Sequence, residues 1–250
     1  MLGVRIFIHS LKQVFGNLGG ALRVIAPIVS AQFAAFYALG HARETAGFGV
    51  GPNGVTPWLV VVSTLLVAIP AVWMAVAWHR LILLGERPRS IFPPFHAGLL
   101  ASYLIYSVLL AIVLLLLGRV LAHYAGSLLF SGGFPSYWTA LLGTSALIYV
   151  PLGFLMLKLS PLLPAAAVGR HLGVVEAWSK TRKSNLALLT VVILAVLCRT
   201  LIILGLLRLA LLSEYYIYVQ LLLGWLTSIV VLSILTTIYG HFVEGRELRA

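Results

Sequence analysis

The sequence predicts an all-α polytopic membrane protein, a bundle of six transmembrane helices with interfacial helices at its inner face. Of the 250 residues, 61% are hydrophobic and only 9% are charged, whereas a soluble domain is about half apolar and about a quarter charged. A helix needs about 20 apolar residues to cross a hydrocarbon core of about 30 Å, and windows of that length recur along the chain. We therefore expect a single integral membrane domain over residues 1–250.

Six windows are long and apolar enough to span. We predict the spans near residues 18–39, 57–78, 97–117, 138–156, 186–207 and 219–239. The third and fourth contain uncharged stretches at residues 99–117 and 141–157. In the other windows, too, the centre is apolar enough for a helix in hydrocarbon.

Two further segments have the composition of helices at a membrane surface. In residues 3–16, apolar side chains such as Val4, Phe7 and Leu11 recur at helical spacing, while polar residues including Lys12 occupy other positions around the helix. A helix of this kind lies among lipid headgroups with its apolar stripe toward the hydrocarbon. Residues 165–183 are rich in small residues and then basic. Both segments are predicted to be interfacial.

The basic residues predict the orientation of the bundle. With a cytoplasmic N-terminus, thirteen lysines and arginines fall on the inner side and three on the outer side, and such a bias sets topology. The thirteen are Arg5, Lys12, Arg23, Arg80, Arg87, Arg89, Lys158, Arg170, Lys180, Arg182, Lys183, Arg246 and Arg249, and the three are Arg43, Arg119 and Arg208. We expect a bacterial inner (cytoplasmic) membrane protein with both termini in the cytoplasm.

The net charge of +11 also indicates partners. Because the charges flank apolar windows and no readout motif accompanies them, we expect no nucleic-acid binding. Basic loops next to spans attract anionic phospholipid, and a larger membrane-protein complex or a homo-oligomer is a further expected partner. The candidate lipid contacts at the inner leaflet are Lys12, Arg170, Lys180, Arg182 and Lys183.

The chain lacks the residues that common membrane enzymes use. It has no aspartate and six glutamates, none near the middle of a span, so clustered carboxylates for divalent cations or glycosyl transfer are missing. No phosphate-binding loop or zinc-protease motif occurs. We expect no catalytic site and no cofactor. A metal site stays open as an alternative at the five histidines of the inner side, which are His9, His79, His96, His171 and His241.

Arg199 lies within the window 186–207. A charge there costs several kcal/mol unless it pairs, faces the bundle interior or reaches water. Glu214, in the following outer loop, is a plausible partner. One interpretation is an anion or lipid-headgroup contact in a water-filled cavity, and the other is an arginine that reaches the membrane surface or binds backbone carbonyls.

Two stretches of the sequence resemble a known family. They are AVAWHRLILLGERP at residues 75–88 and LSPLLPAAAVGRHLGVVEAWSKTRKSN at residues 159–185. The second, a Pro- and Ala-rich exit from the fourth span followed by an "EAW" helix, is similar to bacterial six-span inner-membrane proteins of the YciC type. That group is akin to the membrane domain of some glycerophosphodiester phosphodiesterases. The resemblance implies the architecture and no activity, because the catalytic domain has no counterpart here.

Three functions are compatible with these observations. The first is a non-enzymatic accessory, assembly or envelope-maintenance factor that packs against other membrane proteins and anionic lipid. The second is a component of a transporter or channel for a small anion or lipid, with Arg199 in a bundle cavity. An intramembrane enzyme is the third.

Overall fold

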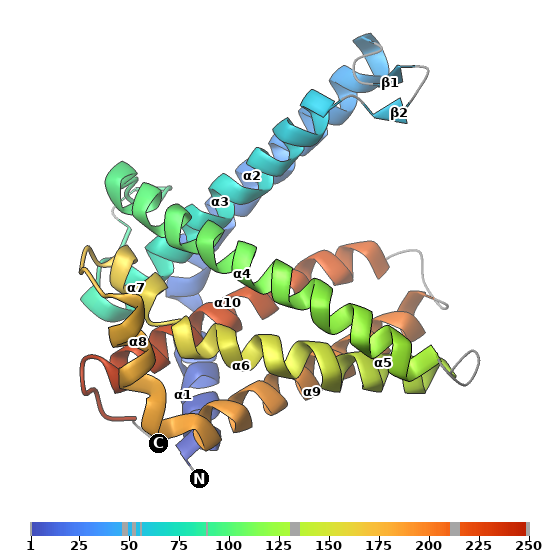
Figure 1. Ribbon diagram of the computed structural model, residues 1–250. Helices are drawn as coiled ribbons and strands as arrows, with labels where there is room; N and C mark the ends of the chain where they lie inside the picture. Colours follow the sequence, from blue (N-terminus) through green and yellow to red (C-terminus); the bar gives the residue numbers. More distant parts are fainter. Residues whose placement is uncertain are drawn as a thin grey trace.

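The computed structural model describes residues 2–46, 50–51, 54–55, 57–88, 90–130, 136–210 and 216–248 (Figure 1). The described residues are helical except for loops and one short antiparallel pair, β1 (Val50–Gly51) with β2 (Gly54–Val55). They include six helical segments that are long and apolar enough to cross a membrane, which confirms the predicted fold class.

The crossing segments begin at or within three residues of the predicted starts. They are α2 (Leu18–Ala46), α3 (Pro57–Leu84), α4 (Ala97–Phe130), the composite of α5 (Tyr137–Thr144), a π turn (Ser145–Tyr149) and α6 (Val150–Leu159), then α9 (Asn185–Ala210) and α10 (Tyr216–Phe242). The helices end later than the predicted spans, and α4 continues past the predicted end near residue 117 through Arg119, one of the predicted outer-side residues. A polar residue marks a membrane surface without breaking a helix, so the sequence underestimates helix length.

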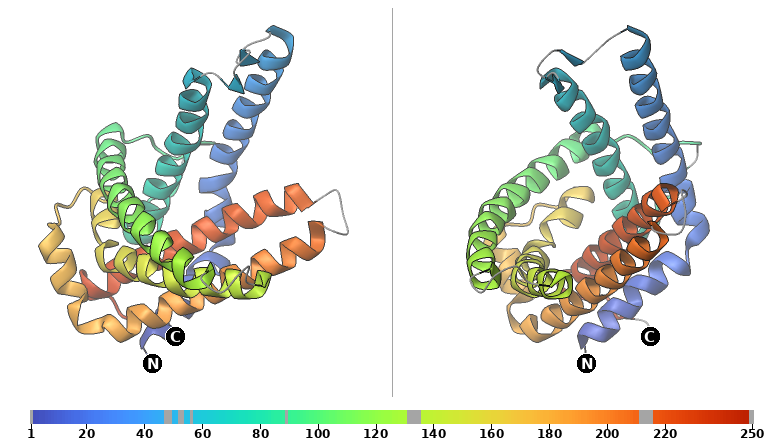
Figure 2. Two further views of the ribbon diagram at one scale, coloured as in Figure 1. Left: turned by 45° about the vertical axis from the view of Figure 1, so that its right-hand side comes forward. Right: turned by 90° about the vertical axis from the view of Figure 1, so that its right-hand side faces the viewer.

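Shorter elements and both chain ends gather at one end of the bundle, which we call the base (Figure 1). The base contains α1 (Leu2–Phe15), α7 (Leu162–Ala167), α8 (Val174–Thr181) and a 3₁₀ turn (Arg182–Ser184). The far ends of the hairpins α2–α3, α4–α5 and α9–α10 are called the hairpin ends. In both views of Figure 2 the α2–α3 hairpin diverges from the other two toward its hairpin end.

The buried core lies at the base. Trp78 of α3, Leu188 of α9 and Tyr239 of α10 are fully buried there. Toward the hairpin ends large apolar side chains are exposed, among them Leu115 at 66% and Leu201 at 67%. Exposed apolar surface on this scale is unfavourable in water and ordinary for helices that contact lipid.

Helix α1 is amphipathic at the predicted position, but its orientation corrects the prediction. Its stripe of Ile6, Ser10 and Val14 is buried against α9 and α10 and does not face hydrocarbon. Gly3 permits this packing, because a Cβ there would lie 2.4 Å from the carbonyl oxygen of Ala187. A second row of apolar side chains, Val4, Ile8 and Phe15, is exposed and can face lipid.

The predicted interfacial segment 165–183 divides into two parts. Residues 165–167 belong to α7, which is buried throughout against α3, α4 and α10, so these residues contact protein at whatever depth they lie, and their interfacial position stays a prediction. Small alanine side chains allow neighbouring helices to approach closely. In α8, by contrast, Val175 and Trp178 are exposed, and its position at a membrane surface stays a prediction.

Candidate functional site

A cavity of about 360 Å³ lies between α1, α6, α9 and α10. Its walls are almost entirely apolar, and they include Gly153 and Met156 of α6, Ala195 and Val196 of α9, and Val230 and Ile234 of α10. Thr227 also lines it, but its hydroxyl donates to the Leu223 carbonyl within α10. The cavity extends from α1 at the base past Arg199 to Ile202, so one exposed charge lies near the far end of an apolar space.

Arg199 lies near the middle of its helix. It is fourteen positions after Asn185 and eleven before Ala210, or about 21 Å and about 16 Å along the axis at 1.5 Å per residue. Within the described part of the chain the guanidinium has no ion-pair partner. Glu214 lies outside the described residues, so its pairing with Arg199 stays a prediction.

Tyr149 of the π turn contacts the Arg199 charge. The Arg199 Cζ atom is 4.2 Å from the centroid of the Tyr149 ring. The ring face attracts a cation but offers no oxygen acceptor to the guanidinium N–H groups. Pro151, two residues later, has no N–H and its ring disfavours a regular α turn before it, which accounts for the wider π turn at this position.

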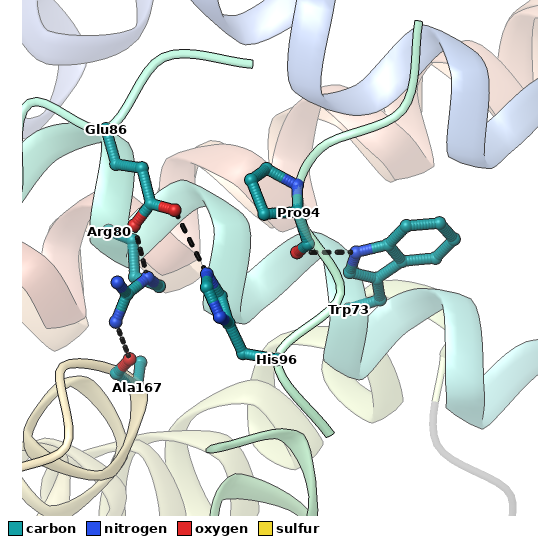
Figure 3. Close-up of polar contacts among 6 residues, drawn as sticks. All are labelled: Trp73, Arg80, Glu86, Pro94, His96 and Ala167. Atoms are coloured by element: carbon teal, nitrogen blue, oxygen red, sulfur yellow. Dashed lines mark hydrogen bonds and ion pairs between the residues drawn. The ribbon is translucent and has the colours of Figure 1, made fainter. Parts of the chain in front are cut away.

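A polar cluster joins the base helices (Figure 3). The Arg80 guanidinium donates through Nε to Glu86 Oε2 at 2.5 Å and through Nη1 to the Ala167 carbonyl at 3.3 Å. His96 Nε2 lies 3.0 Å from Glu86 Oε1. Burial raises the pKa of Glu86, but the hydrogen bonds from His96 and Arg80, and the Arg80 charge, bring it below its ordinary value. The cluster fastens the α3–α4 connection and α7 to α3.

His79 connects three helices inside the base. The Thr236 hydroxyl donates to the Leu232 carbonyl, so it must accept from His79 Nδ1, 2.7 Å away. The remaining nitrogen, Nε2, then accepts from the Tyr103 hydroxyl at 3.3 Å. Both ring nitrogens are occupied by protein groups. Among the described residues no three His, Cys, Asp or Glu side chains come together as a possible metal site.

Lys158 is also part of the core of the base. The sequence places it in an inner loop, but it is 2% exposed at the end of α6. Its Nζ donates to Asn185 Oδ1 at 2.8 Å and lies 4.8 Å from the Trp178 ring centroid. Lys158 therefore joins α6, α8 and α9.

The predicted lipid contacts lie at the base. Lys12 of α1, Lys180 of α8, and Arg182 and Lys183 of the next turn are exposed. Arg170 is exposed as well, but its Nη1 pairs with Glu244 Oε1 at 3.1 Å. Four of the five candidates thus present a positive charge on one end of the molecule.

No protein-family model, curated protein or solved structure matches the chain. The resemblance to the YciC type therefore stays a prediction. Its two stretches contact each other at the base, where Arg80 binds Ala167 and Leu83 packs in one cluster with Leu162 and Ala165.

Proposed function

We propose that this chain is a bacterial inner-membrane protein that holds an anionic lipid, with the negative group at Arg199 and one acyl chain in the apolar cavity. The observation that carries the proposal is one cation, Arg199, near the far end of a cavity whose other described lining residues are almost all apolar. Burying a charge at this depth costs free energy unless a counter-charge is present. The face of the Tyr149 ring carries only a partial negative charge, so it compensates the guanidinium incompletely. A phosphate would accept the guanidinium N–H groups directly.

The length of the cavity suits an acyl chain. Its lining along α9 runs from Val191 to Ile202, which is about 16 Å at 1.5 Å per residue. With the negative group at Arg199, the eight positions back to Val191, about 12 Å, are available to the acyl chain. Because the bilayer interior is as apolar as the cavity, transfer of an acyl chain from the bilayer into the cavity gains little free energy. The pairing with Arg199 would therefore provide most of the selectivity.

In this proposal the base faces the cytoplasm and the protein is a non-enzymatic accessory or envelope-maintenance factor of the YciC-type architecture. The exposed residues Lys12, Lys180, Arg182 and Lys183 support that orientation and contact with anionic lipid. The position of Arg199 near the middle of α9 favours a second candidate function, lipid transport, since a crossing headgroup must pass that depth.

The proposal is tested by measuring bound phospholipid per protein after purification in mild detergent, by mass spectrometry. A charged hydrogen bond contributes about 1.5–3 kcal/mol, so Arg199→Leu should weaken binding of anionic lipid about 10- to 100-fold. Arg199→Lys should retain most of it. Arg208→Leu is the matched control, because Arg208 is on the same helix but does not line the cavity.

A second variant tests the acyl-chain site. Ala195→Phe narrows the cavity and leaves the Arg199 charge in place, so it should also release the lipid. Equal lipid content in the wild type, Arg199→Leu and Ala195→Phe would refute the proposal. Release of fatty acid in place of phospholipid would refute the choice of ligand. If the wild type exchanges lipid between the leaflets of proteoliposomes and Arg199→Leu does not, the result would favour lipid transport as the function.

A further inference from the structure

A second cavity, of about 450 Å³, lies in the base. Its walls come from α1, the end of α3, the end of α10 and the C-terminal residues after α10. In contrast to the Arg199 cavity it is largely polar, lined by His9, Gln13, Thr236, Thr237, His241, Arg246 and Glu247. We infer that this base cavity binds the phosphate group of a phosphate ester.

The cavity wall is fixed in place by the C-terminal residues. Arg5 Nη2 donates to the Leu248 carbonyl at 3.2 Å, and Arg246 Nη2 donates to the Leu83 carbonyl at 2.8 Å. Leu248 is buried at 8% exposure. Gly245 has a φ of +71°, which lets the chain reverse after α10. Residues 246–248 thus close one side of the cavity through contacts with α1 and α3.

The hydrogen bonds in the wall leave donors for a ligand. The Thr237 hydroxyl donates to Gln13 Oε1 at 3.3 Å, so the Gln13 amide group remains as an N–H donor. His241 Nδ1 must donate to the Arg246 carbonyl, 3.0 Å away, so Nε2 of the neutral ring is an acceptor and His241 adds no donor to the cavity. Arg246 Nε pairs with the Glu244 carboxylate and Nη2 donates to the Leu83 carbonyl. The two Nη1 hydrogens of Arg246 remain available to a ligand.

These donors favour an anion. Gln13 of α1 and Arg246 after α10 both line the cavity, and a guanidinium group binds phosphate through short charged hydrogen bonds. Among the described lining residues Glu247 is the one acid, and it is exposed. Sites for small molecules occupy about 300–1,000 Å³, so the cavity admits an organic group beside the phosphate. That ester is either a phospholipid headgroup or a soluble metabolite.

The test uses the full chain in phosphatidylcholine nanodiscs. Soluble sn-glycerol 3-phosphate is titrated in one arm, and phosphatidylglycerol is included in the nanodiscs in the other, with binding followed by native mass spectrometry. Gln13→Glu keeps the oxygen that accepts from Thr237 but replaces the amide donor by a negative acceptor. We expect at least tenfold weaker binding in Gln13→Glu, and equal or tighter binding in Glu247→Gln.

Gln13→Glu adds a negative charge to the cavity and Glu247→Gln removes one. Misfolding would weaken binding in both variants, so it cannot produce weaker binding in one and equal or tighter binding in the other. Melting temperatures near that of the wild type establish that both variants fold. Binding of glycerol phosphate would identify a soluble ester as ligand, and binding of phosphatidylglycerol alone would identify a headgroup. The inference is overturned if neither probe binds at millimolar concentration, if Gln13→Glu binds equally well, or if Glu247→Gln binds more weakly. None of these results depends on Arg199.

Discussion

Gly3 provides the sharpest test of how α1 is attached to the bundle. A Cβ at Gly3 would lie 2.4 Å from the Ala187 carbonyl oxygen and 2.6 Å from Thr190 Cβ. Neither atom belongs to the free end of a side chain, so in Gly3→Ala the helices must separate by about 1 Å to restore van der Waals contact. Overpacking of this kind costs about 1–3 kcal/mol. The shift would also strain the 3.0 Å hydrogen bond from Ser10 to Thr237, a further cost of about 1 kcal/mol.

Thermal unfolding of the purified protein, followed by tryptophan fluorescence, measures the effect. For a chain of this size 1 kcal/mol corresponds to about 2–4 °C, so the combined cost of about 2–4 kcal/mol lowers Tm by about 4–16 °C. Gly19→Ala is the control, since its Cβ would meet no heavy atom within 4 Å and alanine is the better helix former by about 0.5–1 kcal/mol. A Tm of Gly3→Ala equal to or higher than the Tm of Gly19→Ala would refute the packing of α1 against α9.

Three further predictions concern buried or paired polar groups of the base. His79→Phe keeps the ring volume but removes two hydrogen bonds, and it should lower the unfolding free energy by about 1–3 kcal/mol in chemical denaturation. Lys158→Met removes the donor to Asn185 and should cost about 1.5–3 kcal/mol, and an unchanged Tm would contradict its structural role. Because the pKa of Glu86 is lowered on folding, the carboxylate stabilises the protein above its unfolded pKa, near 4.5, and this contribution disappears as the pH falls below that value. The stability difference between wild type and Glu86→Gln should therefore be largest near pH 7 and shrink below pH 4.5, as unfolding at several pH values would show.

The sequence predicts the number and starts of the crossing helices because length and hydrophobicity alone decide whether a segment can span. It does not reveal which apolar face contacts protein and which contacts lipid, since both surroundings favour the same side chains. Helix α1 illustrates this limit, because Ile6 is buried against other helices and Ile8, two residues later, is 45% exposed. Gly3 in the buried stripe was the available signal of close packing.

The candidate site was predictable in part for a similar reason. Arg199 is conspicuous as a charge in an apolar window, but its contact with Tyr149 depends on a π turn and on pairing two distant helices. Lys158 follows an apolar run, which in a sequence is also the position of a lysine at a membrane surface. Its hydrogen bond to Asn185 depends on the packing of α6 against α9 and is not visible in the sequence. The base cavity joins Gln13 to Glu247, a juxtaposition that no local pattern contains.

The concentration of buried residues at the base has a consequence for how this protein must be handled. Toward the hairpin ends the helices have few protein neighbours, so the surrounding bilayer completes their packing and acts as a structural component. Replacing that bilayer by detergent would loosen the α2–α3 arm while the base stays intact. A melting curve in micelles would then report the base alone, and variants near the hairpin ends would show their effects only in a native membrane.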